Sequence, residues 1–113
     1  MFLTGLLLSA ALAQAEPRVD PITFDLRCLL LSAGLRESDN AEARSSGEKA
    51  ALFFFGRVDS RVPQAQLEAR LVREAQALQG LDRGAALRAC GTFMQERGQL
   101  LSEIGGRLEA RGQ

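Results

Sequence analysis

Hydrophobic residues recur along most of the chain at steps of three and four, the spacing that places side chains on one face of an α-helix. Four segments show this pattern: 20–35, 40–62, 63–80 and 82–108. The strict alternation typical of β-strands is absent, and β-branched residues are few. The pattern therefore predicts an all-α fold, a small bundle of about four helices.

Each predicted helix begins at a residue that favours a helix start. Asp and Asn side chains accept hydrogen bonds from first-turn amides, and Pro fits the first turn because no amide hydrogen is needed there. The start residues are Asp20 followed by Pro21, Asn40, Pro63 and Asp82. Gly80 lies where the third helix would take a C-terminal cap.

Segment 20–35 is apolar over most of its circumference. Its apolar positions are Ile22, Leu26, Leu29, Leu30, Leu31 and Ala33. A helix that is apolar nearly all round belongs in the centre of a domain, so we expect this one to be the central helix.

Segment 40–62 contains the run Phe53, Phe54 and Phe55. Its predicted buried stripe consists of Ala51, Phe54, Phe55, Val58 and Val62. Three adjacent aromatic residues cover about 200° of a helix surface, and Phe53 lies off the stripe. Two interpretations stay open: all three rings belong to the core, or Phe53 contributes to an exposed apolar binding patch.

Polar and small residues follow this aromatic run. Arg57 and Arg61 are predicted to form a solvated face, and Asp59 is placed to pair with neighbouring arginines. Gly56 would let another backbone approach closely, because it has no side chain.

Glycine recurs every seventh residue in the last segment. These glycines are Gly84, Gly91, Gly98, Gly105 and Gly112. They flank an apolar row formed by Leu87, Cys90, Met94, Leu101, Ile104 and Leu108, in which Arg97 takes the one polar position. Two interpretations again stay open: the glycines admit a neighbouring helix, or they reflect a composition rich in Gly, Ala, Arg and Leu.

The first 15 residues have the features of a secretory signal peptide. An uncharged apolar run at 3–12 is followed by two small-residue cleavage patterns, ending at Ala13 and Ala15. The run is shorter than the roughly 20 residues of a membrane-spanning helix. We therefore expect export to the periplasm, no stable membrane insertion after cleavage, and a mature helical domain over 16–113.

Two cysteines, Cys28 and Cys90, lie in the predicted mature chain. An oxidising compartment favours their pairing, which would join the first and last mature helices. Closing a loop of about 60 residues stabilises a fold by roughly 4 kcal/mol. The alternative is a pair of buried free thiols.

The composition removes several classes of function. The chain has no His, Tyr or Trp, so Ser-His-Asp and Cys-His catalysis and the usual metal ligand are absent. Carboxylate pairs such as Glu37 with Asp39, or Glu68 with Glu74, are expected to be solvated. The 14 basic and 14 acidic residues balance, which argues against nucleic-acid binding. We expect a non-catalytic protein without metal or cofactor.

Helical layout and the positions of Cys28 and Cys90 make the chain similar to two groups of periplasmic proteins. It resembles HdeA-type acid-stress chaperones and the small immunity proteins of type VI secretion toxins. The stretch FFFGRVDSR, 53–61, is similar to an aromatic-Gly-x-x-Asp stretch of the immunity proteins. Both resemblances imply a disulfide between an early and a late helix and a protein as partner.

Three functions follow in order of expectation. The first is a stress-protective periplasmic chaperone or binder, and the second is an immunity or inhibitor protein with one toxin partner. The third is an enzyme that uses carboxylates alone. A generic protein-interaction module is a further alternative, and Phe53, Phe54 and Phe55 are the candidate binding residues in all the binding cases.

Overall fold

The computed structural model describes residues 19–112, and the predicted signal segment 1–15 lies outside them. This part of the chain forms four helices and no strand. They are α2 (Pro21–Leu35), α3 (Ala41–Asp59), α4 (Gln64–Leu78) and α5 (Arg83–Ala110). The prediction of a small all-α bundle is confirmed.

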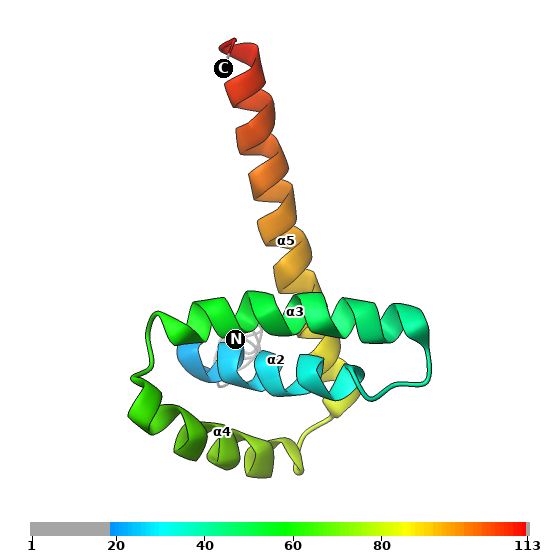
Figure 1. Ribbon diagram of the computed structural model, residues 1–113, viewed down its shortest axis with the longest axis vertical. Coiled ribbons are helices and arrows are strands. Elements are labelled where there is room, and N and C mark those ends of the chain that lie inside the picture. The colour runs from blue at the N-terminus through cyan, green and yellow to red at the C-terminus, as the bar shows by residue number, and fades with distance from the viewer. Residues whose placement is uncertain (1–18, 113) are drawn as a thin grey trace, which may run out of the picture.

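Helix α2 is the central element, as its apolar circumference predicts. It lies alongside α3 and also packs against α4 and α5 (Figure 1). Leu26 and Cys28 of α2 are completely buried. The long helix α5 contacts the other helices only through its first half and then extends away from them.

The predicted starts of the helices are confirmed by their capping bonds. Asp20 accepts bonds from the backbone amides of Ile22 and Thr23. Asn40 and Asp82 cap α3 and α5 in the same way. Pro63 precedes α4 without a side-chain cap bond. These polar residues satisfy amides that lack a partner within the first helical turn.

The expected cap at Gly80 is not the observed one. Helix α4 ends at Leu78 with Gln79 as its C-cap, and Gln79 has a right-handed backbone with φ of −62°. Among the described residues, Gly112 is the one glycine with a positive φ. The helix ends instead with backbone hydrogen bonds between residues three apart. The amides of Gly80 and Leu81 donate to the carbonyls of Ala77 and Leu78.

The core consists of two clusters on either side of α2. One surrounds the disulfide and contains Cys28, Leu31, Phe54, Leu78 and Cys90. The other contains Leu26, Val58 and Val62, with Leu67 and Leu71 of α4 against it. The predicted stripe of α3 is thus buried at Phe54, Val58 and Val62.

The predicted disulfide between Cys28 and Cys90 is present. It joins α2 to α5, with a Cα–Cα distance of 5.6 Å across 62 positions of sequence. Both sulfurs lie in the main core cluster. The bond ties the first half of α5 to the central helix.

The predicted apolar row of α5 is only partly covered by the other described helices. Leu87, Cys90 and Met94 lie against the core, but Leu101, Ile104 and Leu108 are exposed. Periodicity identifies an apolar face, yet it does not say whether a partner within the same chain covers that face.

The close approach expected at Gly56 and along the glycines of α5 occurs at neither place. A Cβ added at Gly56, Gly91, Gly98 or Gly105 would meet no heavy atom within 4 Å. The close approach lies at Gly47, where an added Cβ would come within 2.7 Å of the Ser32 carbonyl oxygen and the Leu35 Cβ. Gly47 is therefore the position at which the backbone of α3 comes close to the C-terminal end of α2.

Substituting Gly47 and Gly56 separately should give opposite effects on stability. Gly47→Ala should lower the free energy of unfolding by about 1–2 kcal/mol, because the overpacking at a backbone oxygen exceeds the gain in helix propensity. Gly56→Ala, on the same helix, should raise it by about 0.8–1 kcal/mol. Urea unfolding followed by circular dichroism measures both. Equal stabilisation by the two variants would contradict the proposed contact between α2 and α3.

Candidate functional site

A carboxylate lies completely buried inside the bundle. Asp25 of α2 has an exposed fraction of 0%. Its Oδ1 accepts a hydrogen bond from Nε of Arg57 at 3.0 Å, and its Oδ2 accepts one from Nη2 of Arg61. A buried charge is costly unless it is paired, so these two arginines are what makes Asp25 tolerable in the core.

The two arginines come from one face of α3. Residues four apart are neighbours on a helix, so Arg57 and Arg61 point in the same direction. Nε of Arg61 also donates to the backbone carbonyl of Arg57 at 2.9 Å. About one third of each arginine side chain stays exposed, at 33% and 32%. The predicted solvated face is therefore wrong: the two side chains reach inward and bind a buried anion.

Arg57 connects this ion pair to a cluster of aromatic rings. Its guanidinium carbon lies 4.6 Å from the centroid of the Phe93 ring and 5.9 Å from that of Phe53. A guanidinium over an aromatic face at such a distance is attracted by the electrons of the ring. Arg57 thereby joins α2, α3 and α5 at one point.

The cluster itself contains four rings, of Phe24, Phe53, Phe54 and Phe93. The rings of Phe24 and Phe93 are 5.4 Å apart, and those of Phe53 and Phe54 are 4.9 Å apart, both edge to face. This geometry is favoured between aromatic rings. The Asp25 ion pair and the aromatic core are thus adjacent parts of one site.

A second ion pair links α2 to α4. Nε of Arg27 lies 2.8 Å from Oε1 of Glu74, and Glu74 is buried. The expectation that Glu74 is a solvated partner of Glu68 is therefore wrong. No ion pair of Asp59 occurs within residues 19–112, so its predicted pairing is not observed either.

The three consecutive phenylalanines lie in different environments. Phe54 is fully buried and Phe53 is half-buried among the other rings. Phe55, predicted to be buried, is 41% exposed, and its neighbour Leu52 is 74% exposed. The most exposed residue of the run is therefore Phe55, so the interpretation that places all three rings in the core is wrong, and Phe53 is partly buried.

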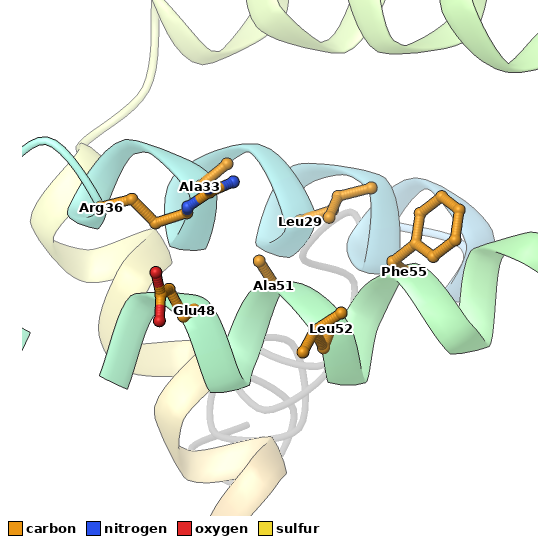
Figure 2. A pocket seen from close by; sticks show the side chains of 7 residues that line it. All are labelled: Leu29, Ala33, Arg36, Glu48, Ala51, Leu52 and Phe55. Carbon is orange, nitrogen blue, oxygen red and sulfur yellow. The ribbon is translucent and has the colours of Figure 1, made fainter. Parts of the chain in front are cut away.

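Phe55 and Leu52 border a pocket of about 420 Å³ between α2 and α3. Figure 2 shows Leu29 and Ala33 of α2 facing Ala51 of α3 across it. Arg36 and Glu48 lie together at the end of the pocket away from Phe55. The arrangement offers an apolar surface with polar groups at one end.

Asp20, at the start of α2, carries a shifted carboxyl group. The Thr23 hydroxyl donates to Asp20 at 2.7 Å, and this bond, with the amide of Thr23, lowers the pKa of Asp20. Because the folded-state pKa lies below the unfolded one, the stabilisation is present above the unfolded pKa. It is lost as the pH falls through the folded value, so the cap of α2 weakens in acid.

One feature of the sequence indicates the ion pairs of Asp25 and Arg27, which were not predicted. Between positions 21 and 35 the only charged residues are Asp25 and Arg27, in an otherwise apolar helix. A charge on a helix expected in the centre of a domain requires a partner. The spacing of Arg57 and Arg61 offered one, although the pattern alone did not show that α3 presents them to α2.

The buried polar groups of the described residues are engaged in contacts within the protein. No group of three metal-ligating residues occurs within 19–112. In the same range every buried polar side-chain atom has a hydrogen-bond partner. The carboxylates that are buried, Asp25 and Glu74, are both engaged with arginines. The site consists of an ion pair that holds helices together, beside an apolar core.

None of the helices in the range 19–112 combines the length and the apolar character needed to cross a membrane. Comparison of the chain with protein-family models, with curated proteins and with solved structures finds no match.

Proposed function

We propose that the protein is an exported, non-catalytic helical binding protein that protects other proteins under acid stress, in the manner of HdeA-type chaperones. The observation that carries this proposal is the buried carboxylate of Asp25, held by Arg57 and Arg61. This contact depends on the negative charge at position 25, because a neutral side chain there would leave the two guanidinium groups without a counter-charge.

Loss of the charge at position 25 would leave two like charges, of Arg57 and Arg61, four residues apart on one face of α3. Like charges at this spacing destabilise a helix, and here they also border the interior. Arg57 contacts the rings of Phe53 and Phe93, so its movement would loosen the aromatic cluster. Acid would thus expose apolar surface at the junction of α2, α3 and α5.

The charged partners of Asp25 both come from α3, and the other helices packed on α2 carry further charged groups. On α2 itself, Arg27 pairs with Glu74 of α4. Between residues 86 and 94, the part of α5 that packs on the core, Arg88 is the one charged residue, and it is exposed. Neutralising the 14 carboxylates of the whole chain would also leave 14 basic residues, whose mutual repulsion favours an open state.

The disulfide would limit this opening. Cys28 and Cys90 hold α5 against α2 when the ion pair is lost. The opened protein would then keep the cysteine-bearing helices α2 and α5 together and present their apolar faces. This surface would add to Leu52 and Phe55 of α3, which are already exposed beside the pocket in Figure 2. Such a state can bind unfolded proteins and return to the folded state on neutralisation.

The proposal is tested by acidifying the oxidised protein from pH 7 to pH 2. We expect binding of the dye ANS to rise at least tenfold below pH 3, while far-UV circular dichroism keeps much of the helical signal, as in acid states with exposed apolar surface. At pH 3 the protein should reduce light scattering by an aggregating, acid-unfolded client protein. The same protein kept at pH 7 is the control and should show neither effect.

Unchanged dye binding and unchanged scattering across this range would reject an acid-activated binder. A fold that persists at pH 2, together with stoichiometric binding of one purified toxin at pH 7, would support the immunity-protein alternative.

A further inference from the structure

The second half of α5 has an apolar face that no other helix in the described chain covers. Residues 95–110 extend beyond α2, α3 and α4 (Figure 1). They measure about 24 Å along the helix axis. The exposed fractions are 71% for Leu101, 39% for Ile104 and 46% for Leu108. These three residues lie at three- and four-residue steps and form one stripe.

This stripe continues a face that is buried earlier in the same helix. Leu87, Cys90 and Met94 precede Leu101 and Ile104 at the same spacing, and they pack on the core. The face therefore loses its cover after Met94, but its apolar pattern continues to Leu108, about four turns further along the helix.

We propose that a second copy of the chain covers this stripe, with the two α5 helices antiparallel about a two-fold axis between residues 102 and 103. In this register Leu101 packs against the partner's Ile104, and Ile104 against the partner's Leu101. The interface is the same on both copies, which is the commonest arrangement of homodimers.

The charges along the stripe favour the antiparallel over the parallel orientation. Arg97 occupies a position in the apolar row. Parallel helices in register would place Arg97 against the partner's Arg97, two like charges in one layer. In the antiparallel register Arg97 meets the partner's Leu108 beside the partner's Glu109, so its stem is packed and its charge is balanced.

The end of the partner helix also meets a complementary charge. Lys49 of α3 lies with Gly91 and Met94 around a depression of about 400 Å³, where α5 leaves the other helices. The antiparallel register brings the C-terminal end of the partner's α5 towards this depression. The last carbonyls of a helix carry partial negative charge, which an adjacent lysine stabilises.

The glycines of α5 fit the same arrangement. Gly98 and Gly105 flank the stripe, and an added Cβ at either would meet nothing within 4 Å in the single chain. In the antiparallel register Gly98 is level with the partner's Arg107 and lies two residues, about 3 Å along the axis, from the partner's Gly105. The lack of side chains at both positions leaves room for the two helices to approach closely.

The first test is the oligomeric state of the protein purified from the periplasm of an exporting host, measured by sedimentation equilibrium. We expect a reversible dimer. Leu101→Glu should weaken dimerisation roughly 100-fold, because the two-fold axis places the new charge in the interface twice. The matched control is Gln99→Glu, which adds the same charge on the polar face and should leave the dissociation constant within about threefold.

Leu101 is exposed in the single chain, so Leu101→Glu should leave its fold intact, and an unchanged circular dichroism spectrum verifies this. A wild-type protein that is monomeric at millimolar concentration overturns the proposal. So does a dimer that Leu101→Glu leaves unchanged. Mass spectrometry of the purified chain establishes whether residues 1–15 are attached, and a dimer seen only with that segment attached also overturns it.

The second test determines the orientation with spin labels on Gln95→Cys and, separately, on Ser102→Cys, with the native disulfide kept oxidised. The two positions are one heptad apart and face the same way. In the antiparallel register their axial separations from the partner's equivalent residue are about 22 Å and about 2 Å, respectively, at 1.5 Å per residue. Equal separations at the two positions indicate parallel helices and overturn the register.

Discussion

Removing the Cys28–Cys90 disulfide by the double substitution Cys28→Ala and Cys90→Ala should lower the free energy of unfolding by roughly 4 kcal/mol. The bond closes a loop between residues separated by 62 positions, so it removes much freedom from the unfolded chain. A domain of this size has a total stability of about 5–15 kcal/mol. Urea unfolding of the oxidised protein and of the variant gives the difference directly.

The structure adds a reason for a large effect. Only the first half of α5 lies against the core, through residues such as Leu87, Phe93 and Met94. Without the bond, α5 is held by these side chains and by the contact of Arg57 with Phe93. We expect α5 to separate from α2 first, at a denaturant concentration at which the contact between α2 and α3 is still intact.

The control for this prediction is reduction of the unmodified protein. A reductant should destabilise the wild-type protein by a similar amount and leave the double variant unaffected. Alanine fills less volume than cysteine. If the double variant is less stable than the reduced wild-type protein, the difference in free energy of unfolding gives the contribution of the packing of the sulfur atoms. A loss below about 1 kcal/mol on reduction would mean that packing alone holds α5 in place.

The sequence was sufficient for the secondary structure because local rules determine it. Asp20 and Asp82 cap the helices that they were predicted to cap, and Asn40, near which a helix was predicted to start, caps α3. The central place of α2 also followed from its apolar circumference. Capping and amphipathicity act within one helix, so they are visible without knowledge of the neighbours.

The site was less accessible because it depends on the rotation of one helix against another. Phe55 shares a predicted stripe with Phe54, yet α3 is turned so that Phe55 is exposed and Phe53 packs among the rings. The same rotation brings Arg57 and Arg61 to Asp25. A stripe three residues wide cannot distinguish rotations of this size.

The glycines illustrate a second limit. Their period on α5 was evident, but the close approach between described helices occurs at the isolated Gly47. A glycine needed for packing is defined by the backbone that lies opposite it, here the end of α2 at Ser32 and Leu35. Sequence spacing contains no information about that backbone.

Asp25→Asn should lower the free energy of unfolding at pH 7 by about 2–3 kcal/mol. Removing one partner of a buried ion pair costs about 3–5 kcal/mol when the other is left without solvent. Arg57 and Arg61 are about one third exposed, so water compensates part of their loss. Asparagine has nearly the same shape and still accepts one hydrogen bond, so the effect reports the charge. Chemical unfolding of both proteins measures it.

The matched control is Asp59→Asn, which removes the same charge from an exposed position of α3. It should change stability by less than about 0.5 kcal/mol. An equal effect of the two substitutions would show that net charge, and not the buried contact, accounts for the loss.

The comparison becomes informative about function when it is repeated in acid. The Asn variant has no charge at position 25 at any pH, and under the proposed function the wild-type protein loses the contribution of this ion pair in acid. The stability difference between the two should therefore narrow as the pH falls from 7 towards 3, and the variant should bind ANS at a higher pH than the wild type does. If the difference stays constant across this range, the ion pair of Asp25 is a structural contact that acid does not release, and the acid-activated function loses the observation on which it rests.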